Sequence, residues 1–165
     1  MTRTLILTRH AKSSWDDPLL SDHDRPLNKR GRKSAPAIGH WLKENGWLPD
    51  EVISSTSTRT RETWDRMGLQ AATISFTQDL YHASSDEMLA VLSTATGETV
   101  LMLGHNPGIA VFARQIVRKA PDHARFHDYP SCATTVIQFN TRDWTKMVWH
   151  SGHVQGFAIP RELLE

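Results

Sequence analysis

The chain has 165 residues, of which 39% are hydrophobic and 22% are charged, so we expect one globular domain over residues 1–165 rather than a disordered chain. Its net charge of +1 argues against binding to nucleic acid or to a membrane surface through overall charge. The single cysteine excludes an internal disulfide. Residues 1–7 are too short and polar for a secretory signal, and no apolar run approaches the ~18 residues of a membrane span. We therefore expect a cytoplasmic protein.

The first third of the chain predicts a strand, a loop and a helix. Residues 4–8 form a short apolar run that is typical of a buried strand. Residues 13–27 contain two prolines, which indicates a long loop. Asn28 is a good helix cap, and the helix that it begins should continue to about Asn45, where Gly46 ends it.

The middle third continues this alternation. Residues 51–54 and, with a weaker pattern, residues 73–76 predict strands. Between them, residues 58–67 predict a helix, because side chains suited to burial recur at spacings of three and four. Ser84 and Glu87 have the spacing of a capping box, which indicates the start of another helix.

The last third predicts three strands and one helix. Residues 99–103 are strongly apolar and predict a buried strand. Pro107 suits the first turn of the helix that follows, and the apolar face of this helix continues to Val117. Residues 134–139 and 146–150 predict two strands that pair as an antiparallel hairpin.

This order of elements predicts an α/β protein, a three-layer α/β/α sandwich with a mainly parallel central sheet. In such sheets, ligands bind beyond the carboxyl ends of the strands. Arg9 and His10 follow the first strand, Ser55 and Arg59 follow the second, and His105 follows the strand at 99–103. We therefore expect two histidines and at least one arginine at one edge of the sheet.

These side chains suit phosphoryl transfer. A neutral imidazole is a good nucleophile near neutral pH and can accept a phosphoryl group. Arginine forks match the negatively charged oxygens of that group, and a second, protonated histidine can donate to one of them. Helix starts near Asn28 and Asn106 could add backbone donors. Taken singly, each residue has a simpler interpretation as a loop or surface residue, and only their convergence favours a site.

Other kinds of site find little support. The sequence has no phosphate-loop, zinc-protease or nucleophile-elbow motif. Its histidines form no tight cluster of metal ligands, so we expect neither a metal nor another cofactor. Cys132 has no neighbouring pattern that would activate it, which favours a buried structural thiol.

Four segments together resemble the histidine phosphatase, or phosphoglycerate mutase-like, superfamily. They are Leu-Thr-Arg-His-Ala-Lys-Ser at 7–13, Leu-Asn-Lys-Arg-Gly at 27–31, the serine- and arginine-containing segment 54–63, and Gly-His-Asn-Pro at 104–107. Asp-Arg-Pro-Leu at 24–27 and Leu-Tyr-His-Ala at 80–83 are similar to its SixA-type branch, which acts on phosphohistidine. The resemblance implies a metal-independent phosphatase with a phosphohistidine intermediate.

The resemblance also implies roles for individual residues. His10 would accept the phosphoryl group, Arg9 and Arg59 would bind phosphate, and His105 would stabilise the group during transfer. Ser13 would add a hydroxyl contact. Apart from Ser13, these residues are also among those selected from the strand ends.

Three positions leave alternatives open. Arg61 takes the place of Arg59 if the alignment shifts by two residues. Ala11 replaces the usual glycine, which is acceptable if its φ is negative. The general acid of mutases and broad phosphatases is not obvious, and Asp79 and His82 are the candidates. A phosphohistidine substrate needs less acid assistance, since its nitrogen leaving group can be protonated before it departs.

The expected partner is a phosphorylated protein, such as a phosphotransfer domain, or a small phosphate ester, and neither nucleic acid nor a membrane. Residues 77–83 are too few for a large cap, and an open site suits a protein surface. The alternatives are a small-molecule phosphomonoesterase, a phosphoglycerate mutase-like enzyme, or a catalytically weak phosphate-binding module. Basic residues at the predicted helix start form either a solvated surface or a docking patch for an acidic protein: Arg25, Lys29, Arg30, Arg32 and Lys33.

Overall fold

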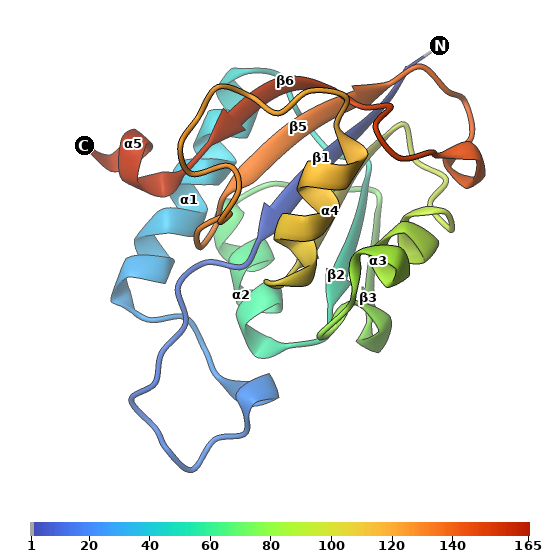
Figure 1. Cartoon of the computed structure of the whole chain (residues 1–165). Coiled ribbons are helices and arrows are strands. Elements are labelled where there is room, and N and C mark those ends of the chain that lie inside the picture. The colour runs from blue at the N-terminus through green and yellow to red at the C-terminus, as the bar shows by residue number, and fades with distance from the viewer. Residues whose placement is uncertain (1) are drawn as a thin grey trace.

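A computed structural model describes residues 2–165 and contains one central sheet covered by helices (Figure 1). The strands are β1 (Arg3–Arg9), β2 (Glu51–Ser55), β3 (Thr73–Thr77), β4 (Thr99–Gly104), β5 (Thr134–Phe139) and β6 (His153–Ala158). The helices are α1 (Lys29–Glu44), α2 (Thr58–Met67), α3 (Ser85–Leu92), α4 (Gly108–Ile116) and α5 (Pro160–Leu164). Three short 3₁₀ turns are η1 (Asp22–Asp24), η2 (Gln78–Leu80) and η3 (Trp144–Lys146).

The sheet has the strand order β3-β2-β4-β1-β5-β6 and is mainly parallel. Strands β3, β2, β4 and β1 run parallel to one another, whereas β5 is antiparallel to both β1 and β6. Helices cover both faces, with α3 and α4 in front of the sheet in Figure 1 and α1 and α2 behind it. The predicted three-layer α/β/α class is therefore confirmed.

The two faces of the sheet bury separate apolar cores. Strand β1 contributes to both, because successive side chains of a strand point to opposite faces. Leu5 and Leu7 pack in the core under α3 and α4, whereas Ile6 packs in the core under α1 and α2. All three side chains are fully buried. This double burial explains why residues 4–8 form a continuous apolar run instead of an alternating one.

The predicted helix starts have the caps that the sequence indicates. The Asn28 side chain accepts a hydrogen bond from the Gly31 amide at the start of α1. At the start of α3, Ser84 and Glu87 form both hydrogen bonds of a capping box. Gly46 follows α1 with a φ of 75°, the left-handed conformation that favours glycine. Pro107 is the capping residue of α4 and lies one position before the first turn in which it was expected.

The predicted second strand of the C-terminal hairpin is wrong. Residues 146–150 do not form a strand, and the partner of β5 is β6 at His153–Ala158. The Asp143 side chain caps η3 at the start of this segment, and His150 has a φ of 60°, so the backbone turns twice where an extended strand was expected. The apolar character of the segment serves packing instead, since the Trp149 ring lies 5.8 Å from that of Phe112 on α4.

Parallel pairing brings three strand ends to the same edge of the sheet. Arg9 at the end of β1 is opposite Gly104 at the end of β4, and Ser54 of β2 is opposite Leu103 of β4. The residues that follow these strands therefore meet, although they are far apart in the sequence. Within residues 2–165, no helix combines the length and the apolar character needed to cross a membrane.

Candidate active site

A pocket of about 290 Å³ lies at the carboxyl ends of β1, β2 and β4. It brings together six of the residues that the sequence selected: Arg9, His10, Ser13, Arg59, His82 and His105. Its remaining lining residues are Lys12, Trp15, Asp22, Arg25, Asn106 and Ser131. The predicted contribution of the helix start at Asn28 is not found, because this residue does not line the pocket, whereas Asn106 does.

His10 has one ring nitrogen held by the backbone and the other available for reaction. Its Nδ1 lies 2.7 Å from the carbonyl oxygen of Ala11. A carbonyl can only accept a hydrogen bond, so Nδ1 carries the proton and Nε2 keeps its lone pair. Burial, followed by the neighbouring His105 and the two arginines, lowers the pKa of His10 well below its ordinary value. The ring is therefore neutral near pH 7 and can act as a nucleophile.

The backbone next to His10 is tied to the helix that carries Arg59. The Ala11 amide donates to the Thr63 hydroxyl (2.9 Å), which donates in turn to the carbonyl oxygen of Arg59 (2.7 Å). Ala11 is not among the residues with positive φ in the described part of the chain, so alanine replaces the family's glycine here without backbone strain. The nucleophile and one arginine thus keep a constant relative position.

His105 faces His10 across the pocket, with the two ring centres 5.1 Å apart. Its Nε2 lies 2.9 Å from the Ser55 hydroxyl. That hydroxyl accepts from the Ser57 amide, and its proton can then be donated to Nε2 of His105. In this arrangement Nδ1 of His105 carries a proton, and Nδ1 is buried with no partner among the described residues.

His105 differs in charge from the protonated donor that the sequence suggested. Burial, followed by the charges of Arg59 and His82, lowers its pKa to about 3, so the ring is neutral before an anion arrives. A neutral ring with its proton on Nδ1 can still donate one hydrogen bond to a phosphoryl oxygen. The role of His105 stays a prediction, and the protonation state that the sequence suggested is corrected.

Arg9 and Arg59 bring two guanidinium groups to the pocket. Arg9 donates to the carbonyl oxygen of Tyr129 (3.1 Å), and its Nε is buried without a partner among the described residues. Arg59 is 5% exposed, so its charge is largely removed from water. Arg61 points elsewhere, because it donates to the carbonyl oxygen of Thr56 and lies over a phenyl ring on β3. The structure thus places Arg59, and not Arg61, in the pocket.

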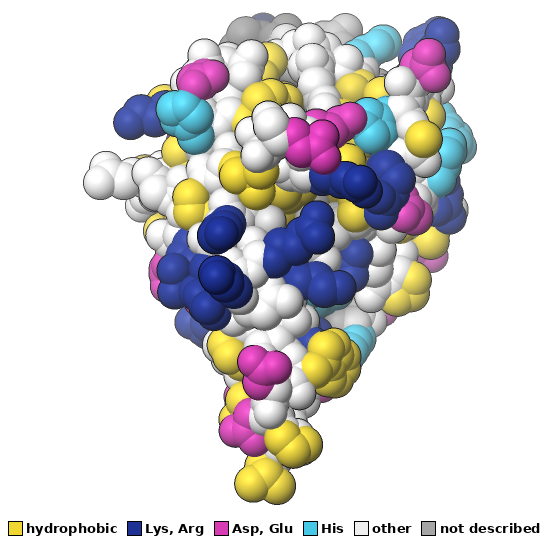
Figure 2. All heavy atoms as spheres, turned by 90° about the vertical axis from the view of Figure 1, so that its left-hand side faces the viewer, with side chains coloured by type: hydrophobic (Ala, Val, Ile, Leu, Met, Phe, Trp, Pro, Cys, Tyr) yellow, Lys and Arg dark blue, Asp and Glu magenta, His cyan; other side chains and the backbone are white. Residues whose placement is uncertain are grey.

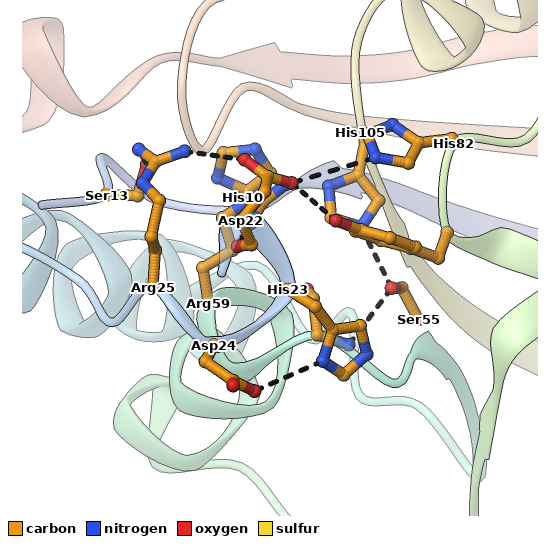
Figure 3. Close-up of polar contacts among 12 residues, drawn as sticks. His10, Ser13, Asp22, His23, Asp24, Arg25, Ser55, Arg59, His82 and His105 are labelled. Atoms are coloured by element: carbon orange, nitrogen blue, oxygen red, sulfur yellow. Dashed lines mark hydrogen bonds and ion pairs between the residues drawn. The ribbon is translucent and has the colours of Figure 1, made fainter. Parts of the chain in front are cut away.

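Asp22 is the main pocket residue that the sequence analysis missed. Figure 3 shows its carboxylate between Arg25 and His82. It accepts hydrogen bonds from Arg25 (2.9 Å), Arg59 (3.0 Å) and the Tyr81 hydroxyl (2.5 Å). Although burial raises the pKa of this carboxyl group, the hydrogen bonds from Tyr81 and the two arginines hold it well below its usual range. Asp22 therefore stays ionised and orients two cations.

Arg59 keeps donors for a ligand despite this ion pair. One terminal nitrogen donates to the backbone oxygen of Asp22 and the other to its carboxylate. Each terminal nitrogen of a guanidinium carries two N–H groups, so two N–H groups remain. No sequence signal marked Asp22, because it lies in the loop at 13–27 and meets Arg59 only through the fold.

The two candidate acids in the turn after β3 have different positions. His82 lines the pocket, and its Nε2 lies 3.7 Å from the carboxylate of Asp22. Asp79 is exposed and lines a separate pocket against α3. The expectation that Asp79 supplies an acid therefore finds no support in its position. Tyr81, between them, packs its ring edge-on against His105 at 5.4 Å.

The loop at 13–27 forms the outer wall of the pocket. The Ser13 hydroxyl accepts a hydrogen bond from Arg25, so it is already engaged when no ligand is present. Trp15 is 75% exposed and stacks on the Arg25 guanidinium at 3.2 Å. Stacking on an aromatic face and the bond to Asp22 keep the Arg25 fork in one orientation.

Neither the cysteine nor a metal cluster offers another chemistry in the described residues. Burial raises the pKa of the Cys132 thiol to about 12, so it is not a nucleophile near neutral pH. Within residues 2–165 there is no group of three or more histidine, cysteine or acidic side chains that could hold a metal ion. What the pocket contains is two neutral imidazoles, one able to attack and one able to donate a hydrogen bond, and arginine forks, an arrangement able to hold and transfer a phosphoryl group.

Comparisons with known proteins agree with this chemistry. The sequence model of the histidine phosphatase superfamily (branch 1) matches residues 5–81. An uncharacterised protein of Mycobacterium tuberculosis is 36% identical over 160 residues, which are 93% of this chain and 99% of that protein. An uncharacterised chloroplastic protein of Arabidopsis thaliana is 38% identical over 122 residues, 66% of this chain, and the match spans 56% of that protein. The structure of a proposed phosphohistidine phosphatase SixA from Nakamurella multipartitia has a TM-score of 0.83 and 29% identity, with 97% of each chain covered.

Proposed function

Because this chain belongs to the histidine phosphatase superfamily and to its SixA-type branch, we propose that it hydrolyses phosphohistidine in proteins through a phosphoryl group carried on His10. The observation that carries the proposal is the free lone pair on Nε2 of a neutral His10, at the centre of two arginines and His105. That the chain is a phosphatase follows from its family. The protein substrate and the residue roles are the proposal.

In the first step, Nε2 of His10 attacks phosphorus, and the bond from phosphorus to the imidazole nitrogen of the substrate breaks. The leaving imidazole takes up a proton from the solvent. Negative charge on the transferring oxygens is matched by Arg9 and Arg59 and by the Nδ1–H of His105. The proton of His10 stays on Nδ1 throughout, where it is donated in a hydrogen bond to the Ala11 carbonyl oxygen.

In the second step, water attacks phosphorus and the bond from phosphorus to Nε2 of His10 breaks. Inorganic phosphate leaves, the water gives up a proton to solvent, and neutral His10 is restored. In the first step His10 needs no general base, since its lowered pKa already leaves Nε2 without a proton.

The acid–base groups of the pocket favour a nitrogen leaving group over an alkoxide. Among the described residues that line the pocket, Asp22 is the only carboxylic acid, and its lowered pKa leaves it no proton to donate, so His82 is the one remaining candidate for an acid. An alkoxide needs a proton as it departs, whereas a phosphorylated imidazole can be protonated beforehand. This supports phosphohistidine rather than a sugar phosphate or phosphoglycerate as the substrate.

The proposal is tested by trapping the intermediate. The wild-type protein, given labelled phosphohistidine peptide and quenched within milliseconds, should carry an acid-labile, alkali-stable phosphoryl group. His10→Ala should show no such label and should lose turnover on the order of 10³-fold or more, because the nucleophile is gone. His153→Ala is the matched control, since His153 is an exposed histidine on β6. Label or turnover retained by His10→Ala would exclude this mechanism.

A further inference from the structure

A second pocket adjoins the active site and is surrounded by cations. It has a volume of about 300 Å³, and four basic side chains reach it: Lys12, Arg30, Arg125 and Arg161. Lys12 and Ser131 line both this pocket and the active-site pocket, so the two lie side by side. We call it the basic pocket. Figure 2 shows lysine and arginine side chains gathered in the middle of the face on which it opens.

The positive charge of the basic pocket is only partly balanced. Arg125 bonds to Asp128 (3.0 Å), and Arg161 lies 3.4 Å from Glu165 in a pair that is largely exposed on both sides. Within residues 2–165, neither Lys12 nor Arg30 forms an ion pair. Like charges gathered around one hollow repel one another, and a bound anion relieves that repulsion. The chain as a whole carries only +1, so this concentration is a local feature.

The fold holds the basic pocket in place relative to His10. Its cations come from separate segments: the loop after β1, the first turn of α1, the segment before β5, and the start of α5. The amide of Cys132, next to Ser131, donates to the carbonyl oxygen of His10 at 2.9 Å. A Cβ on Gly31 would lie 2.2 Å from the Lys12 carbonyl oxygen, so the start of α1 packs directly on the loop after β1. The distance from the nucleophile to the cations is therefore set by packing.

We propose that the basic pocket is a docking subsite for aspartate or glutamate side chains of the protein that carries the phosphohistidine, next to its phosphorylated imidazole. This proposal rests on the proposed function. Lys12, Arg30 and Arg161 are exposed, and exposed cations steer and orient an acidic protein surface. A small anion would call for buried, preorganised forks such as that of Arg59. The basic cluster at the start of α1 suggested a docking patch from the sequence. Of that cluster, only Arg30 lines the basic pocket, and Arg161 on α5 lines it as well.

The test uses two synthetic phosphohistidine peptides. One has aspartate and glutamate on both sides of the phosphohistidine, and the other has asparagine and glutamine at the same positions. The double variant Arg30→Gln/Arg161→Gln removes two exposed cations of the basic pocket. Lys43→Gln/Arg118→Gln is the matched control, because both residues are exposed, carry the same total charge and line neither pocket.

For the wild-type protein, kcat/KM for the acidic peptide should exceed that for the neutral peptide by ~3- to 10-fold at low salt, the size expected for two exposed ion pairs. Arg30→Gln/Arg161→Gln should bring the ratio close to one, and the control should keep it. Phosphoimidazole, which has no acidic side chains, should be hydrolysed equally by all three proteins. Raising the salt concentration from about 0.05 M to about 0.5 M should reduce the wild-type ratio.

Two results would overturn the proposal. The first is an acidic-to-neutral ratio that Arg30→Gln/Arg161→Gln leaves unchanged. The second is a loss of kcat/KM in Arg30→Gln/Arg161→Gln that is confined to a doubly anionic small ester such as phosphoglycerate, measured against phenyl phosphate. That result would assign the basic pocket to a small-molecule anion. Calorimetry on His10→Ala protein distinguishes failure of the docking subsite from failure of the proposed function. If this protein binds the acidic peptide more tightly than the neutral one, and adding Arg30→Gln/Arg161→Gln removes that preference, the docking subsite is supported even if no peptide is hydrolysed.

Discussion

His10 and His105 are both neutral rings, but their hydrogen bonds prepare them for opposite tasks. The Ala11 carbonyl accepts a hydrogen bond from Nδ1 of His10, which keeps the proton on Nδ1 and leaves a lone pair at Nε2. The Ser55 hydroxyl can donate to Nε2 of His105, and in that arrangement the ring keeps its proton at Nδ1. One ring can therefore attack phosphorus, while the other can donate to an oxygen. The neighbour of each ring, and not its charge, sets this difference.

Ser55→Ala should reduce the rate of phosphoryl transfer. Without the hydroxyl, Nε2 of His105 loses its partner and the proton is free to move there from Nδ1, which removes a donor to the transition state. We expect kcat to fall by ~10- to 100-fold with a smaller change in KM, measured by steady-state kinetics on phosphoimidazole. Ser54→Ala is the control, because the Ser54 hydroxyl is equally buried but bonds only to a backbone carbonyl. Equal losses in the two variants would argue against the assigned tautomer.

The importance of Asp22 could not be predicted from the sequence. An aspartate in a loop with prolines and other charged residues has no periodicity and belongs to none of the four family segments. Its importance comes from partners 37 and 59 positions away, Arg59 and Tyr81. Arg59 and His105, in contrast, come within four residues of the ends of buried strands, and that position could be identified from hydrophobic patterning.

At the scale of elements, α1 depends on two glycines that allow backbones to touch. A Cβ on Gly31 would lie 2.2 Å from the Lys12 carbonyl oxygen, and one on Gly39 would lie 1.9 Å from the Met67 carbonyl oxygen on α2. Such distances require the backbone to shift. The first contact borders the active site, and the second lies between α1 and the end of α2.

Gly31→Ala and Gly39→Ala should both lower the free energy of unfolding by ~1–3 kcal/mol, as overpacking does in well-packed interiors. Only Gly31→Ala should also reduce kcat/KM, because Lys12 is two residues from His10. Denaturant unfolding and steady-state kinetics on the same samples separate the two effects. Each variant is the control for the other, and a matching loss of activity in Gly39→Ala would show that the effect is not local.

The turn after β3 carries two candidate acids that the fold separates. Asp79 faces a different pocket, so Asp79→Asn should leave kcat/KM within ~2-fold for every substrate, as surface substitutions usually do. His82→Gln should reduce hydrolysis of an alkyl phosphate more than that of phosphoimidazole, since only the alkoxide needs a proton on leaving. The measurement is the ratio of the two kcat/KM values in each variant. An Asp79→Asn protein that loses alkyl phosphate activity would restore this residue as the acid.

For the whole molecule, the buried histidines make stability depend on pH. The pKa of His105 is about 3 in the folded protein against 6.5 for an ordinary histidine, and that of His10 is lowered in the same direction. Below about pH 6.5 the unfolded chain binds protons that the folded protein excludes, so stability is lost as the pH falls from 6.5 towards 3. Asp22 adds a loss only below its ordinary pKa of 3.8.

The free energy of unfolding should therefore fall by roughly 2–3 kcal/mol from His105 alone between about pH 7 and pH 4.5. Denaturant unfolding at each pH measures this change. His105→Gln should flatten the dependence by that amount, because it removes a group that titrates only when unfolded. His153→Gln, at an exposed site, should leave the slope unchanged. A slope identical in His105→Gln and wild type would contradict the lowered pKa.

Hydrophobic periodicity and capping residues predicted most elements, including α2 and β5 at their observed bounds. They failed at residues 146–150, where Val148 and Trp149 give an apolar pattern but the backbone turns. A local pattern cannot distinguish a strand from a turn that packs its apolar side chains on a neighbouring helix. The helix α5 was likewise not predicted, because five residues are too few to show a period.

The sequence by itself determined the class of fold, the edge of the sheet at which the candidate active site lies, and the residues that follow its buried strands. These properties follow from local patterns and from the rule that parallel strands end at the same edge. Only the tertiary structure decided that Arg59 and not Arg61 enters the pocket, that Asp79 does not, that Asp22 orients two arginines, and that both histidines are neutral. Those outcomes depend on burial and on contacts between distant segments, which no short stretch of sequence contains.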